Sequence, residues 1–252
     1  MSSPTLQLTV LGAGPSYTDR PGATGAAYLV EGAGTAMLLD LGQGSFPRLT
    51  AAIEPSRLDA VVISHLHPDH FIDLIPLRLY LFYEFAPPRR VPVLGPAGLG
   101  SRIDGLHEAP GFTAAALDCV QLGSGERKIG SLTLESRLVA HTDESYATRL
   151  SVAGGPGLVY SGDCGAADDL APLIRPGDTL LVEVSFGAGP VPEGVLHLDA
   201  PAIARLVEAT TPGNVLLTHL QMGFDREAAV RVVADASTAP VHLVDPGDRY
   251  RI

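Results

Sequence analysis

The sequence Ser64-His65-Leu66-His67-Pro68-Asp69-His70 places three histidines and one aspartate within six residues, directly after a predicted apolar strand. Because His65 and His67 are two positions apart, an extended backbone sends both imidazoles to the same side. Asp69 and His70 lie on the turn that follows and face a second point close by. Imidazole nitrogens and carboxylate oxygens are the ligands that zinc takes when thiolates are absent. The stretch therefore predicts a metal site; the alternative is a polar loop with surface histidines that caps a helix.

Further metal ligands are expected at the ends of other strands, because one loop is too short to complete two metal shells. His141 ends a predicted strand, Asp163 follows a second one, and His219 follows a third. Alone, each is typical of a turn or a helix cap, but loops after buried strands also gather functional groups. Together with the first motif they give five histidines and two aspartates. The candidate ligands are His65, His67, Asp69, His70, His141, Asp163 and His219.

Composition limits the class of protein. Apolar residues make up 46% of the 252 residues, enough to bury a sizeable core. No apolar run reaches the roughly 18 residues that a membrane span needs, and the first residues lack the pattern of a secretory signal. The chain has two cysteines, Cys119 and Cys164, which is typical of a reducing compartment, so a cytoplasmic location is expected. The net charge of −11 repels phosphate backbones and disfavours a nucleic-acid binder.

Short apolar runs alternate with Gly and Pro turns and with helical spacings in both halves of the chain. Strands predominate first and then alternate with helices, which predicts two stacked sheets with helices outside. The linker-like stretch 187–194 is too short to separate domains, so residues 1–252 are expected to form a single domain. The predicted strands cover residues 6–11, 27–31, 36–40, 60–64, 91–95, 117–122, 132–141, 148–153, 157–161, 179–184 and 214–218. The predicted helices cover residues 46–53, 72–82, 99–108, 166–174, 200–209 and 226–236.

Seven short motifs, each with polar residues at or near a strand end, follow one another along the chain. They are Leu39-Asp40-Leu41-Gly42, His65-Leu66-His67-Pro68-Asp69-His70, Val139-Ala140-His141, Tyr160-Ser161-Gly162-Asp163, Leu181-Val182-Glu183, His197-Leu198 and Leu217-Thr218-His219. In this order the motifs resemble those of the metallo-β-lactamase fold superfamily, in its branch of ribonuclease Z-like phosphodiesterases.

The resemblance covers nearly the whole chain and implies an α/β (α+β) fold, a four-layer αββα sandwich of two mixed β-sheets. It places the metals at one edge between the sheets. By resemblance, His65, His67 and His141 hold one metal. Asp69, His70 and His219 hold the other, and Asp163 bridges the two. Two divalent ions are therefore expected, with Zn²⁺ as the default and Mn²⁺ or Fe²⁺ as alternatives.

Two further residues fit the ribonuclease Z branch, which pairs a glutamate after the Asp-bearing strand with a histidine before the last helix. Here these are Glu183 and His197; without the resemblance they would be a surface carboxylate and a helix-flanking histidine. In the implied mechanism, a metal-bound hydroxide attacks phosphorus, and Asp69 holds one metal and orients the hydroxide. His197, positioned by Glu183, contacts the phosphate and protonates the leaving oxygen. The expected catalytic residues are Asp69, Glu183 and His197.

The substrate is expected to be a small phosphodiester. Ribonuclease Z enzymes usually carry a tRNA-binding arm between the positions of His141 and Asp163, but here only 21 residues separate them. The stretch 137–146 and the hairpin after it look most like the compact cyclic-nucleotide phosphodiesterases of this branch, which open 3′,5′-cyclic AMP to the 5′-nucleotide. The alternatives are a tRNA 3′-processing endonuclease, an acyl hydrolase (lactonase or thioesterase) on the same metals, and a metal-stabilised binding or sensor module.

Four local features remain. The family usually has glycine where Asp73 stands, and we expect Asp73 to cap the next helix rather than orient a ligand imidazole. Cys164 is expected to be a small buried residue rather than a ligand. The stretch 12–15 lacks the third glycine of a dinucleotide cradle and is expected to be a turn, so no organic cofactor is expected. The apolar stretch 74–85 is expected to pack in the core, with a pocket wall or a homodimer contact as alternatives.

Overall fold

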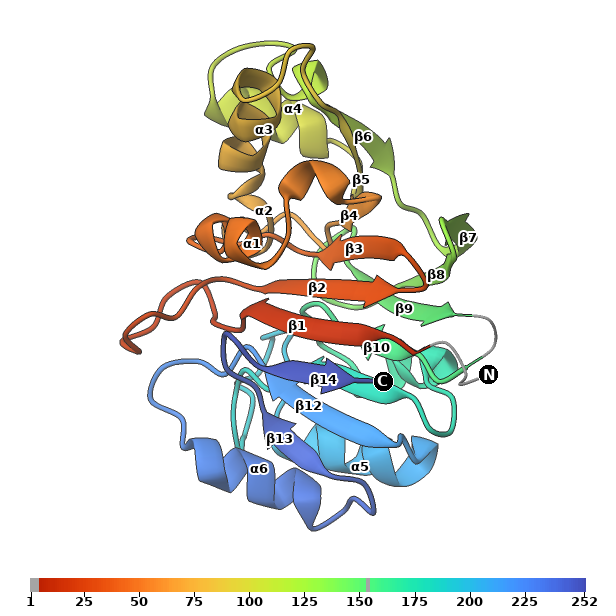
Figure 1. Cartoon of the computed structure of the whole chain (residues 1–252). Coiled ribbons are helices and arrows are strands. Elements are labelled where there is room, and N and C mark those ends of the chain that lie inside the picture. Colours follow the sequence, from red (N-terminus) through yellow and green to blue (C-terminus); the bar gives the residue numbers. More distant parts are fainter. Residues whose placement is uncertain (1–4, 153–154) are drawn as a thin grey trace.

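The computed structural model describes residues 5–152 and 155–252, and it consists of two stacked β-sheets with helices on both outer sides (Figure 1). In spatial order, the first sheet contains β14 (Arg249–Arg251), β1 (Gln7–Gly12), β2 (Ala27–Gly32), β3 (Thr35–Leu39), β4 (Ala60–Val62), β5 (Val91–Gly95) and β6 (Leu117–Gln121). The second contains β13 (Val241–Leu243), β12 (Asn214–Thr218), β11 (Thr179–Glu183), β10 (Leu158–Tyr160), β9 (Tyr146–Val152), β8 (Leu132–Leu138) and β7 (Gly125–Ile129). The α-helices are α1 (Phe46–Ala52), α2 (Pro68–Phe71), α3 (Leu74–Tyr83), α4 (Leu99–Leu106), α5 (Ala200–Thr210) and α6 (Arg226–Ala234).

Both sheets are mixed. In the first, β14, β1, β2 and β3 pair antiparallel, whereas β3, β4, β5 and β6 pair parallel. In the second, β7 to β10 pair antiparallel, and β10 to β13 pair parallel. The predicted four-layer αββα sandwich of two mixed β-sheets is therefore confirmed.

Three apolar layers hold the four structural layers together. The central strands are buried on both faces, and successive residues of a strand point to opposite faces. In β2, Tyr28 and Val30 pack between the two sheets, whereas Leu29 packs toward the helices of the first sheet. In β12, Leu216 likewise faces the other sheet, and Leu217 faces the layer that contains α5 and α6. Both outer layers are visible in Figure 1, with α1 to α4 beside the first sheet and α5 and α6 beside the second.

The predicted elements agree with the structure in most places and differ in a few. The helix predicted over residues 166–174 is wrong: two 3₁₀ turns, Ala167–Asp169 and Ala171–Leu173, lie there, since Pro172 supplies no backbone N–H to an α-helix. The strand predicted over residues 132–141 ends at Leu138. The strand predicted over residues 148–153 begins at Tyr146, and its last residue lies outside the described residues. The short or exposed edge strands β7, β13 and β14 were not predicted.

Parallel strands bring their carboxyl ends to one edge of a sheet, where ligand sites of α/β proteins lie. In the first sheet, Asp40 follows β3 and His65 comes shortly after β4. In the second sheet, Asp163 follows β10, Glu183 ends β11 and His219 follows β12. The candidate residues of both sheets therefore meet at one edge. Over residues 5–152 and 155–252, each helix is too short or too polar to cross a membrane.

Candidate metal centre and active site

A first group of metal-binding side chains is formed by His65, His67, His141 and Asp163. One donor atom from each lies within 4.8 Å of the others. The Nδ1 atom of His67 is 2.9 Å from Nε2 of His65 and 3.1 Å from Nε2 of His141. The Oδ2 atom of Asp163 lies 3.7 Å from His65 Nε2 and 3.6 Å from His141 Nε2. The extended backbone at His67 thus sends its ring to the same side as that of His65, as the spacing predicts.

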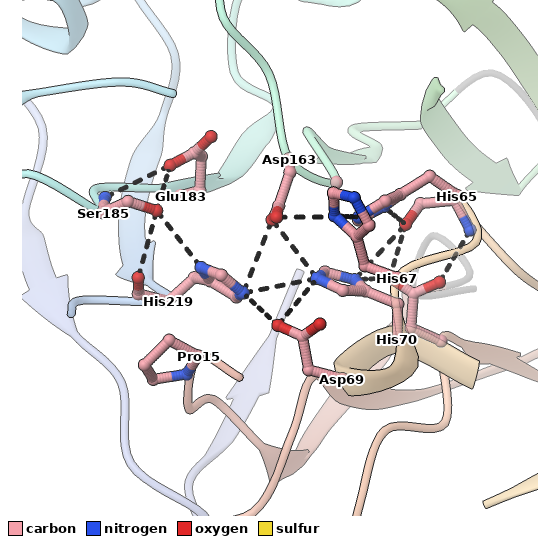
Figure 2. A network of polar contacts seen from close by, with 12 residues as sticks. Pro15, His65, His67, Asp69, His70, Asp163, Glu183, Ser185 and His219 are labelled. Atoms are coloured by element: carbon pink, nitrogen blue, oxygen red, sulfur yellow. Dashed lines mark hydrogen bonds and ion pairs between the residues drawn. The ribbon is translucent and has the colours of Figure 1, made fainter. Parts of the chain in front are cut away.

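A second group is formed by Asp69, His70 and His219, beside the first (Figure 2). The Nε2 atom of His219 is 3.2 Å from Oδ2 of Asp69 and 3.3 Å from Nε2 of His70. The second oxygen of Asp163, Oδ1, is 3.3 Å from His70 Nε2 and 3.6 Å from His219 Nε2. Asp163 therefore directs one carboxylate oxygen to each group.

Local backbone geometry brings these side chains together. Asp69 and His70 lie on α2, which begins with Pro68 at its first position. A Cβ atom on Gly42 would lie 1.8 Å from the carbonyl oxygen of Asp69, so only glycine lets these two loops approach. Gly162 has a φ of 56°, which turns the chain after β10 so that Asp163 faces the histidines.

Two non-glycine residues of the site have left-handed backbones: Asp40, with a φ of 57°, and His219, with a φ of 59°. Such conformations are unfavourable and tend to cluster at functional sites. The backbone N–H of His219 donates to the carbonyl of Ala13, 3.0 Å away. Figure 2 shows Pro15 on the side of the cluster formed by His219 and Asp69. The turn over residues 12–15, for which the sequence indicated no role in a site, therefore supports a candidate ligand.

The imidazoles are oriented through their outer nitrogens. Nδ1 of His70 donates to Oδ2 of Asp40 at 2.7 Å, and Nδ1 of His141 donates to the carbonyl of Leu196 at 2.7 Å. Because a carboxylate and a carbonyl only accept, each Nδ1 carries the proton, and Nε2 is the nitrogen that can offer a lone pair. In both rings Nε2 faces the cluster, the arrangement expected of metal-ligating histidines.

Asp40 was quoted in a sequence motif but not predicted as a site residue. It is completely buried, and its carboxylate accepts four hydrogen bonds. The donors are Ser64 N and Oγ (both 2.7 Å), His70 Nδ1 (2.7 Å) and Tyr160 Oη (2.6 Å). Asp40 therefore orients His70, the role that was the alternative for Asp73. The preferred prediction for Asp73 is also wrong, since its side chain accepts from Phe46 N of α1 at 2.8 Å and makes no capping bond to α3.

The charges of the cluster are balanced between carboxylates and imidazoles. Burial would raise the pKa of Asp163, but the surrounding histidines, His219 and His70 first, hold it well below its usual range. Burial and the neighbouring His70 keep the pKa of His65 well below its ordinary value. For His70, the effect of burial is outweighed by Asp163 and Asp40, which raise its pKa well above the ordinary value. A metal cation would displace the proton that these carboxylates otherwise hold on His70.

Glu183 and His197 lie beside the cluster and form a pair. His197 Nδ1 is 2.9 Å from Oε1 of Glu183, which is completely buried and also accepts from Cys164 N at 2.8 Å. The His197 ring centroid is 4.8 Å from that of His141, and its Nδ1 is 4.0 Å from Oδ2 of Asp163. Burial would lower the pKa of His197, but the hydrogen bond and charge of Glu183 raise it above the ordinary value. Cys164 is buried, as predicted, and its thiol contacts the carbonyl of Ala166.

The donor atoms fit divalent metal ions. Ring nitrogens of His65, His67 and His141 face one another at about 3 Å, which is unfavourable for neutral imidazoles unless a proton or a cation lies between them. Oδ1 of Asp163 is buried and accepts no hydrogen bond of good geometry from the residues that the structure describes, although His70 Nε2 is 3.3 Å away. Imidazole and carboxylate ligands suit zinc and similar divalent metals.

Known proteins match this chain along most of its length. A family model described as the beta-lactamase superfamily domain matches residues 37–220. Over 257 aligned positions, the chain is 31% identical to an uncharacterized protein of Mycobacterium leprae (strain TN), with 98% of this chain and 89% of that protein covered. It is 26% identical to a ribonuclease Z of Pyrobaculum arsenaticum (strain DSM 13514 / JCM 11321 / PZ6), with 97% of each chain covered.

Solved structures show the same architecture. The crystal structure of the metallo-β-lactamase fold protein YhfI from Bacillus subtilis superposes with a TM-score of 0.87 at 20% identity, covering 99% of this chain and all of that one. A diphosphatase from the PhnP family superposes with a TM-score of 0.76 at 18% identity, covering 97% of each chain. The chain therefore belongs to the β-lactamase superfamily, in the ribonuclease Z-like branch of the metallo-β-lactamase fold.

Proposed function

We propose that this protein is a metal-dependent phosphodiesterase that opens 3′,5′-cyclic nucleotides, cyclic AMP among them, to 5′-nucleotides. The observation that carries the proposal is the Glu183–His197 pair, which lies 4.0 Å from Asp163 at the edge of the metal-binding groups. This pair provides a proton donor beside the place of bond cleavage, which an acyl hydrolase on the same groups does not need. Two of the similar proteins, a ribonuclease Z and a diphosphatase, have the names of enzymes that cleave phosphorus–oxygen bonds.

In this proposal two divalent metals bind at the two groups, most simply as Zn²⁺, with Mn²⁺ or Fe²⁺ as alternatives. His65, His67 and His141 would hold one metal, and Asp69, His70 and His219 would hold the other. Asp163 would be a ligand of both, since its two oxygens face different groups. When bound, the metals polarise the phosphoryl oxygens and lower the pKa of a water molecule.

The protein side chains position the reacting groups. Glu183 accepts the Nδ1–H of His197 and raises the pKa of the ring, so that a protonated His197 can give the proton on its other nitrogen to the leaving oxygen. Asp69, a proposed ligand of the second metal, also orients the attacking water. Its Oδ2 lies 3.2 Å from Nε2 of His219, the nitrogen that would bind the same metal.

An open pocket lies beside His197, with Val195 and Arg205 in its wall. Its volume of about 430 Å³ is within the range of small-molecule sites, and we propose that it takes the nucleoside of the substrate. The segment between His141 and Asp163 has only 21 residues, ten of which lie in β9 and β10, and the net charge is −11. These features disfavour tRNA as the substrate. Both sheets supply site residues, so we propose that residues 1–252 act as one domain. The stretch 74–85 packs in the core through Leu74, Leu77 and Leu81, as predicted; a homodimer contact through it was the alternative.

We expect the Zn²⁺-loaded protein to hydrolyse 3′,5′-cyclic AMP, because His197 is placed to protonate a leaving alkoxide. In the proposed reaction water adds to phosphorus, the bond to the 3′ oxygen breaks and that oxygen takes the proton, which gives 5′-AMP. Product formation is followed by chromatography against both nucleotide standards. The control is the same protein after chelation, with activity restored by added metal. Turnover of a lactone, a thioester or a precursor tRNA, with none of cyclic AMP, would contradict the cyclic-nucleotide proposal.

Asp40→Asn is expected to weaken the metal held by His70 about 10- to 100-fold, the usual effect of losing a residue that orients a ligand. The amide nitrogen cannot accept the hydrogen bonds that the carboxylate accepts from Ser64, His70 and Tyr160. Zn²⁺ affinity is measured by competition with a chelator. Asp104→Asn is the matched control, because the carboxylate of Asp104 accepts from Thr113 and Gly111, which lie outside the site. Equal affinities for Asp40→Asn and the control would remove Asp40 from the site.

A further inference from the structure

Ser185 lies two residues after Glu183 and is completely buried. Its hydroxyl makes a short hydrogen bond with Oε2 of Glu183. The Oγ atom of Ser185 is also 3.2 Å from Nδ1 of His219 and 3.3 Å from Nδ1 of His197. Figure 2 shows Ser185 between Glu183 and His219. One hydroxyl therefore contacts the carboxylate of the proposed proton-donor pair and a proposed ligand of the second metal.

The directions of these hydrogen bonds follow from donor and acceptor chemistry. A carboxylate only accepts, so the Ser185 O–H donates to Glu183 and its oxygen is left to accept. The Nδ1–H of His219 can then donate to Ser185, which leaves Nε2 of His219 with its lone pair. That Nε2 faces Asp69 and His70. Over the described ranges 5–152 and 155–252, Ser185 is the residue whose side chain hydrogen-bonds to His219 Nδ1.

Each carboxylate oxygen of Glu183 accepts two hydrogen bonds, one of them from a backbone N–H. Oε1 accepts from His197 Nδ1 and from Cys164 N, and Oε2 accepts from the backbone N–H and the hydroxyl of Ser185. The two backbone N–H groups cannot turn away. The carboxylate thus sets the direction of the Ser185 hydroxyl as firmly as it sets the ring of His197.

We propose that Ser185 is a positioning residue through which Glu183 selects the tautomer and the orientation of His219. One buried carboxylate then controls two functions, holding the proton donor His197 directly and a ligand of the second metal through Ser185. This proposal rests on the proposed binding of two metals. If it is correct, the affinity of the second group for its metal depends on Ser185 and Glu183, which are not among its proposed ligands.

The test measures stepwise Zn²⁺ affinities by chelator competition, without substrate. His70→Ala identifies which step belongs to the second group. Ser185→Ala is expected to weaken that step about 10- to 100-fold and to leave the other step within about twofold of the parent. Ser185→Thr, which keeps a hydroxyl, is expected to restore the affinity of that step. Ser136→Ala is the matched control, because Ser136 is also buried and its hydroxyl donates to the carbonyls of Gly123 and Gly125.

Glu183→Gln gives a second, independent measurement. An amide has one acceptor and one donor side, so it must oppose an N–H of either Cys164 or Ser185. The variant is expected to weaken the same Zn²⁺ step, although the carboxylate of Glu183 reaches His219 only through Ser185. Unchanged affinities in Ser185→Ala, or equal weakening of both steps, would overturn the proposal. If the Zn²⁺ affinities change as expected but the parent does not turn over cyclic AMP, the proposed substrate is overturned and the role of Ser185 stands. A parent protein that binds no second Zn²⁺ would overturn both proposals.

Discussion

Asp163→Asn is expected to lower the turnover of the metal-loaded protein by a factor on the order of 10³ or more, because both metals lose their shared anionic ligand. Asp163 is buried, and each of its oxygens faces a different group of donor atoms. An amide supplies one neutral acceptor, and its N–H₂ side must face either the histidines of the first group or those of the second. One of the two carboxylate charges that hold the pKa of His70 well above its ordinary value is lost as well.

The measurement combines metal content by elemental analysis with turnover of cyclic AMP. Asp225→Asn is the matched control, because Asp225 caps α6 by accepting from Ala228 N, and asparagine caps a helix about equally well. Chelation of the parent protein should reproduce the loss seen in Asp163→Asn. Retained activity in Asp163→Asn with one metal per chain would contradict the two-metal arrangement.

The parts of the site that could be predicted from the sequence are those that depend on the spacing of neighbouring residues. His65 and His67 are two residues apart on extended backbone, so their common direction follows from the sequence. The layered architecture is also predictable locally, from mostly apolar runs such as β3 and β11, which are buried along their whole length. Asp163 and His219 could be chosen because each follows a buried apolar strand, and His141 because it comes shortly after the alternating strand β8.

The residues that sequence reasoning missed act through contacts between distant segments. Asp40 belongs to a quoted motif, yet its contact with Tyr160 joins strands of different sheets. Ser185 has no unusual spacing, and its link to His219 crosses 34 residues. Asp73 was misassigned for the same reason, because it bonds Phe46, 27 residues earlier, instead of the helix that follows it. Tertiary contacts decide such roles, and a single sequence does not display them.

His197→Ala is expected to lower the turnover of cyclic AMP about 10²- to 10⁴-fold, the usual contribution of a general acid, with metal content near that of the parent. Glu183 holds Nδ1 of His197 at 2.9 Å, so the ring is oriented before substrate binds. The loss should depend on the leaving group. A nitrophenyl phosphodiester releases a stable phenolate that needs no proton, so His197→Ala should hydrolyse it at a rate much closer to the parent's.

The leaving-group comparison separates proton donation from metal binding. Donor atoms of Asp163, Glu183 and His197 also lie within 4.8 Å of one another, so His197 has the geometry of a ligand as well. If His197 were a ligand, its removal would lower metal content and slow both substrates equally. His242→Ala is the control, since His242 is exposed and packs near Tyr250, away from the cluster. A metal content that stays normal, together with a defect confined to the poor leaving group, assigns the proton to His197.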